Sequence, residues 1–91
     1  MLDDVLRRID AGRDAAVARM MELLRLPSIS ADRAYRHHID AAAEWVALQL
    51  RDLGLDVAIR ETGGPPAVVA TTRPESVANP AAPRVLFYGH Y

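Results

Sequence analysis

His90 is the residue of this sequence whose type and position best fit a chemical role. It follows the apolar run Val85–Tyr88 and a single glycine. Open α/β sheets bind ligands at the carboxyl ends of their strands, and a glycine there lets the backbone turn sharply or approach a bound group. An imidazole can serve as a neutral metal ligand or as an acid/base near neutral pH. The local pattern leaves two alternatives, a functional ligand or a hydrogen-bonded structural histidine.

Two other groups of polar residues invite a chemical interpretation that their spacing does not favour. His37 and His38 are adjacent, and neighbouring residues on a helix point about 100° apart. We therefore expect them on the surface and not as a chelating pair. Ser28 and Ser30 lack the sequence of a nucleophile elbow. They are predicted to form turn and cap hydrogen bonds.

Composition excludes several classes of function. The 11 basic residues are all arginine and oppose 12 acidic ones, for a net charge of −1. The absence of lysine and cysteine rules out a thiol nucleophile, a disulfide, a cysteine-bound zinc and a lysine Schiff base. Near-zero charge argues against a nucleic-acid partner.

The charged N-terminus does not resemble a signal peptide, and no apolar run is long enough for a membrane span. We expect a soluble, cytoplasmic protein without a membrane partner.

Two helices are predicted before residue 54. Apolar residues recur at helical spacing from Leu2 to Leu26, with a local bend expected at Gly12. Pro27 should end this helix. Asp32 is a candidate N-cap for the next helix, and Gly54 a candidate left-handed residue after it. Trp45 should pack beside the second apolar stripe, which consists of Ile39, Ala43, Val46, Leu50 and Leu53.

Strands are predicted after Gly54. Apolar and polar residues alternate over 55–60, and residues 67–72 form a second strand-like run after the turn Gly63–Pro66. The two should pair as an antiparallel hairpin, followed by a surface loop over 73–83. The nearly continuous apolar run at 84–88 predicts a third strand covered on both faces. Because two helices and a hairpin cannot cover such a strand, we expect residues 1–91 to be the N-terminal part of a larger α/β domain.

Four segments of this sequence resemble a family of zinc metallopeptidases. Tyr88–Tyr91 is similar to the family's Y-G-H-x-D metal-binding signature, and Leu24–Ser30 is similar to its L-x-x-P-S-[IV]-S segment. Ala42–Val46 and Leu53–Leu55 resemble the helix between them and its exit into a strand. The family includes cytosolic dipeptidases, carnosinases, acetylornithine deacetylase, succinyl-diaminopimelate desuccinylase and carboxypeptidase G. Each motif is weak alone, but their order spans the chain, and the last tetrapeptide is most similar to the dipeptidase branch.

The resemblance implies a fold and an activity. The fold would be the helix–helix–hairpin–strand start of a three-layer α/β/α zinc-exopeptidase domain. The activity would be cleavage of the amide bond of a dipeptide or N-acyl amino acid by a metal-activated water. His90 would bind one of two zinc ions, with cobalt or manganese as alternatives. The full-length protein would be a candidate homodimer.

This chain matches only one part of the family's active site. Zinc needs at least three protein ligands, so we expect residues 1–91 alone to be inactive and to bind no metal stably. No catalytic residue is assigned in this chain, His90 is assigned as a metal ligand only, and the substrate-binding residues stay unknown. A different class of function also remains open. In that alternative, the chain is a small non-catalytic α/β module that pairs with another chain through its third strand and its apolar helix stripe.

Overall fold

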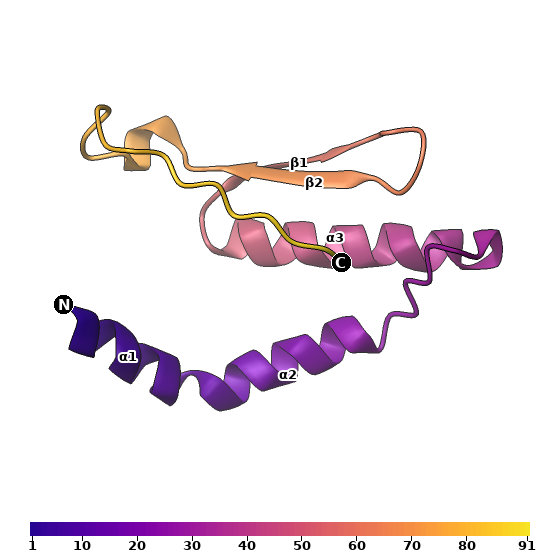
Figure 1. Cartoon of the computed structure of the whole chain (residues 1–91), viewed down its shortest axis with the longest axis horizontal. Helices are drawn as coiled ribbons and strands as arrows, with labels where there is room; N and C mark the ends of the chain where they lie inside the picture. Colours follow the sequence, from indigo (N-terminus) through magenta and orange to yellow (C-terminus); the bar gives the residue numbers. More distant parts are fainter.

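The computed structural model describes residues 1–91 and begins with a bent helical arm (Figure 1). Helix α1 spans Leu2–Ala11 and helix α2 spans Arg13–Leu24. Gly12 separates them with φ −92° and ψ 3°, so the single helix predicted over 2–26 is instead two helices with the bend at Gly12. The helical path ends before Pro27, as predicted. No residue of α1 or α2 is buried.

Helix α3 spans Arg36–Asp52 and is entered through a short 3-10 turn, η1, at Arg33–Tyr35. The Asp32 carboxylate accepts a hydrogen bond from the amide of Ala34 at 2.9 Å, which confirms it as a cap, although the helix that it caps is η1. Gly54 follows α3 with φ +84°, the left-handed conformation predicted for it.

Strands β1 (Asp56–Arg60) and β2 (Ala67–Thr71) form the predicted antiparallel hairpin. Val57 lies opposite Ala70, and Ile59 opposite Val68. Gly63 adopts φ +83° in the turn between the strands, a value that glycine accepts without steric cost. These two strands are the whole sheet.

One face of the hairpin is covered by α3, and the core lies between them (Figure 1). Five of the 91 residues are buried. Pro66 before β2 is one of them. The other four lie on α3 at helical spacing, and because three are alanines the helix can lie close to the strands: Ile39, Ala42, Ala43 and Ala47. Leu53, predicted at the end of the same stripe, is 74% exposed where the helix ends.

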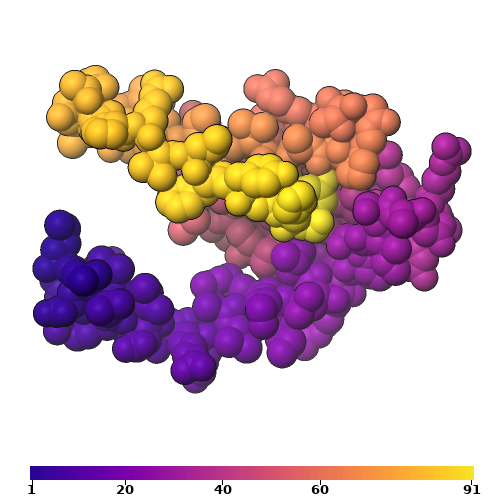
Figure 2. Space-filling model, in the orientation of Figure 1, coloured from indigo at the N-terminus to yellow at the C-terminus, as the bar shows by residue number.

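The predicted third strand is absent. Residues 72–90 contain one 3-10 turn, η2, at Pro74–Ser76, and 84–88 form no strand. The four apolar residues predicted to be covered on both faces are at least 76% exposed: Val85, Leu86, Phe87 and Tyr88. The physical reason is that a strand needs a hydrogen-bonded neighbour, and the segment makes no backbone hydrogen bond with β1 or β2. Figure 2 shows it running across the front of the molecule.

The architecture is therefore mixed α/β, with three helices and one two-stranded antiparallel sheet. None of the helices combines the length and the apolar character that crossing a membrane would require.

Candidate functional site at His90

His90 lies on the exposed segment after η2, away from any regular element. Its Nε2 is 3.2 Å from the hydroxyl of Tyr88, and the two rings meet edge to face with their centroids 5.2 Å apart. The contact is local, since the two residues are separated only by Gly89. It leaves the imidazole accessible to a ligand or to another part of a protein.

The residues around His90 do not by themselves fit a zinc centre. The chain contains no group of three or more His, Asp or Glu side chains placed to hold a metal ion. The neighbour that His90 does have is a neutral phenol, which is not a ligand of the His/carboxylate type expected from the resemblance. No chemical step through a metal can be assigned to these residues alone.

The histidines of α3 lie elsewhere and have a different environment. His37 is exposed and His38 is half-buried. Their ring centroids are 3.9 Å apart, so the side chains bend toward each other more than the helical angle suggests. The ring of Tyr35 is 5.7 Å from that of His38. The three rings form an aromatic group at the start of α3 without a third metal ligand.

The serines before α3 do not act as predicted. The hydroxyls of Ser28 and Ser30 form no hydrogen bond, and the turn is held by backbone contacts such as the amide of Ser28 with the carbonyl of Leu26, 2.8 Å apart. The prediction of side-chain turn and cap bonds at these two residues was therefore wrong. The backbone of the turn provides its own hydrogen bonds, so its shape does not depend on the two hydroxyls.

Tyr91 is the residue beside His90 that sequence reasoning did not assign. Its hydroxyl donates a hydrogen bond to the carbonyl of Pro66, and it is half-buried while residues 71–90 are exposed. Burial raises the pKa of Tyr91 above its ordinary value of 10.0; nearby Asp40 and Glu61 raise it further, and Arg36 lowers it. The partner is 25 residues away in sequence, so no local pattern could have indicated this contact.

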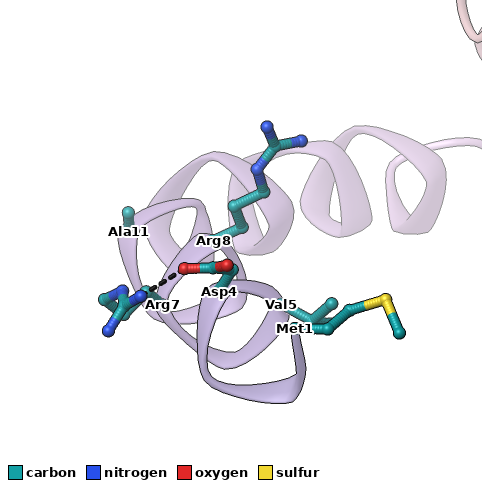
Figure 3. A pocket seen from close by; sticks show the side chains of 6 residues that line it. All are labelled: Met1, Asp4, Val5, Arg7, Arg8 and Ala11. Carbon is teal, nitrogen blue, oxygen red and sulfur yellow. Dashed lines mark hydrogen bonds and ion pairs between the residues drawn. The ribbon is translucent and has the colours of Figure 1, made fainter.

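A surface depression lies on α1 (Figure 3). His90 is not among the residues that line it. Its lining comes from successive turns of one exposed helix: Met1, Asp4, Val5, Arg7, Arg8 and Ala11. Asp4 and Arg7 form an ion pair across it. The depression has no opposing wall from another element, so it does not enclose a ligand.

Trp45 is half-buried on α3, which fits the packing beside the apolar stripe predicted for it. Its indole N–H donates to the Glu22 carboxylate at 3.2 Å. This is the polar contact that joins the helical arm to α3.

Comparisons of this chain with known protein families, with curated proteins and with solved structures gave no match.

Proposed function

We propose that this chain is the N-terminal segment of a metal-dependent hydrolase that cleaves the amide bond of dipeptides or N-acyl amino acids. In this proposal His90 supplies one ligand of the metal centre. The observation that carries it is the ordered set of motifs ending in Tyr88-Gly89-His90-Tyr91. Within that set, the glycine–histidine pair follows an apolar run, and open α/β sheets bind ligands at the carboxyl ends of their strands.

Two features of the structure support the proposal. The imidazole of His90 is exposed and contacts only a phenol, so it is free to join ligands supplied from residues outside this chain. The side chains of Val85–Tyr88 are also exposed. Contiguous exposed apolar surface is typical of a site that packs against further protein. Burial of this run in a larger sheet would place His90 at the edge of that sheet.

The test uses the complete product of the gene that encodes these residues. We expect it to copurify with a divalent metal and to hydrolyse unblocked dipeptides or N-acetyl amino acids, with activity lost to a chelator and restored by zinc. His90→Gln should lower kcat/KM by at least ~100-fold, because replacing even a residue that only orients a metal ligand lowers metal affinity or activity by about 10–100-fold. His37→Gln is the matched control, because His37 is an exposed histidine on α3, and should leave activity unchanged.

The outcomes of this test are distinct. An absence of metal-dependent hydrolysis would contradict the proposed function. Equal effects of His90→Gln and His37→Gln would contradict the ligand role of His90. The 91-residue chain alone should bind zinc no better than its His90→Gln variant, since one imidazole does not hold the metal.

A second candidate function is a non-catalytic module that pairs with another chain. The observation that favours it is the run of exposed apolar residues on the helical arm, which includes Leu2, Leu6, Ile9 and Met20. Sedimentation velocity with circular dichroism separates the two candidates. A stable oligomer with a cooperative unfolding transition would support the module, whereas a weakly folded or aggregating chain would support the hydrolase segment.

A further inference from the structure

The segment after β2 has polar contacts with the body of the molecule at its two ends only. At the start, Arg73 Nε lies 3.3 Å from Asp56 Oδ1. At the other end, the Tyr91 hydroxyl donates to the carbonyl of Pro66. Residues 74–90 form no hydrogen bond or ion pair with residues 1–72. We call residues 74–90 the C-terminal strap.

The acceptor for Tyr91 is held in place by the turn of the hairpin. Pro66 is buried just before β2. The preceding turn is fixed from two sides, because the Thr62 hydroxyl donates to the carbonyl of Pro65 at 2.8 Å and Arg36 Nη2 donates to the carbonyl of Gly64 at 2.9 Å. The Pro66 carbonyl thus belongs to the unit of hairpin and α3, while its donor is Tyr91, the residue directly after the strap.

The charged groups around Tyr91 come from two elements. Asp40 and Arg36 face it from α3, where they pair with each other at 3.5 Å, and Glu61 faces it from the end of β1. A phenol donates a hydrogen bond to a carbonyl only in its neutral form.

We propose that the Tyr91 hydroxyl is a clasp: its hydrogen bond to Pro66 holds the C-terminal strap against the hairpin, and breaking it frees the strap while the hairpin and α3 stay folded. The strap carries Tyr88 and His90, so the clasp also fixes where that pair lies. This inference does not depend on metal binding by His90. It rests on the distribution of contacts, because Tyr91 makes the one hydrogen bond between residues 74–91 and residues 1–72.

The test compares two variants that each lose one phenolic oxygen. Tyr91→Phe removes the clasp, and Tyr88→Phe is the control on the same strap, where the side chain is 83% exposed. Backbone ¹⁵N relaxation on the full chain gives the order parameters of the amides at 89–91. We expect values above ~0.6 in the unaltered protein and in Tyr88→Phe, and values below ~0.6 in Tyr91→Phe. The amides of β1 and β2 should not change, and nuclear Overhauser contacts between the ring of residue 91 and Pro66 should disappear only in Tyr91→Phe.

The clasp would be refuted by a strap end that is already mobile in the unaltered protein, or by equal mobility in both variants. Loss of the helical dichroism signal in Tyr91→Phe would also refute it, because the hydroxyl would then support the whole fold.

Discussion

Asp32 shows what one side chain contributes where the chain enters its longest helix. The residue has the extended conformation of a cap, with φ −121° and ψ 118°, and its Oδ1 accepts the amide of Ala34. The following α3 has Tyr35 at its own N-cap position, without a side-chain cap. Asp32 therefore satisfies an amide that would otherwise have only water as a partner at this end.

Replacing Asp32 by alanine should destabilise the protein. We expect Asp32→Ala to lower the free energy of unfolding by about 1 kcal/mol, the usual loss of a cap. Asp52→Ala is the control, because Asp52 is exposed at the C-terminal end of α3, where a negative charge opposes the helix dipole. Asp52→Ala should not lower the free energy of unfolding. Urea denaturation followed by circular dichroism measures both, and equal losses would contradict the role of Asp32 as a cap.

The residue scale also shows which contacts a sequence can reveal. Asp32 and Gly54 act on backbone within two or three residues of themselves, so residue type and position predict their roles. The Tyr91 hydroxyl and the Trp45 indole have partners 25 and 23 residues away. Their partners are set by how the elements pack, and no local pattern specifies that. The same holds for the metal ligands that would have to join His90.

At the scale of elements, the joint between α1 and α2 depends on one glycine. Gly12 leaves helical geometry, and a Cβ built on it would lie 3.2 Å from the carbonyl oxygen of Arg8. The amide of Ala16 still bonds to the Gly12 carbonyl at 2.9 Å, so the helical path bends without breaking. The bend is visible in Figure 1.

Alanine at position 12 should straighten the arm. In regular helical geometry alanine is about 1 kcal/mol more favourable than glycine, and that geometry avoids the close contact with the Arg8 carbonyl. We expect Gly12→Ala to increase the helical dichroism signal and to join α1 and α2. Gly89→Ala should change nothing, because a Cβ there meets open space. A signal that falls in Gly12→Ala would show that other contacts fix the bend.

The sequence predicted the pairing of β1 with β2 correctly, whereas the strand predicted at 84–88 is absent. Residues 56–60 alternate in polarity, residues 67–71 form an apolar run, and only six residues separate them, so each is the natural partner of the other. The run at 84–88 has strong strand composition, but pairing is a property of two segments. The composition of 84–88 indicates that the segment can form a strand, but it does not show which other strand it would pair with.

On the scale of the whole molecule, the chain is extended. Its radius of gyration is 15.8 Å, whereas a compact domain of this length would have about 12 Å. The principal extents are 46 × 32 × 17 Å. Figure 1 looks down the shortest of them and shows α3 stacked on the hairpin, with the helical arm set apart below. A core of five buried residues holds this unit together. Each of those residues therefore carries a large share of the stability.

Ile39 should be the most sensitive of them to truncation. It is 4% exposed and is the only large side chain among the four buried residues of α3. We expect Ile39→Ala to lower the free energy of unfolding by about 2–4 kcal/mol, enough to unfold the hairpin and α3 if they are marginally stable. Leu48→Ala is the control, since Leu48 is 53% exposed on the same helix, and should cost less than ~1 kcal/mol. Thermal denaturation distinguishes the two variants. Similar losses of stability in both would contradict the assignment of Ile39 to the core.

The position of Trp45 gives the molecule an intrinsic optical probe. It is the only tryptophan of the chain, and its indole bonds to Glu22 where α2 meets α3. Separation of the arm from the helix would expose the indole to water and shift its emission to longer wavelength. Docking of the arm is therefore measurable by fluorescence in the unlabelled protein, under conditions where circular dichroism shows that α3 and the hairpin stay folded.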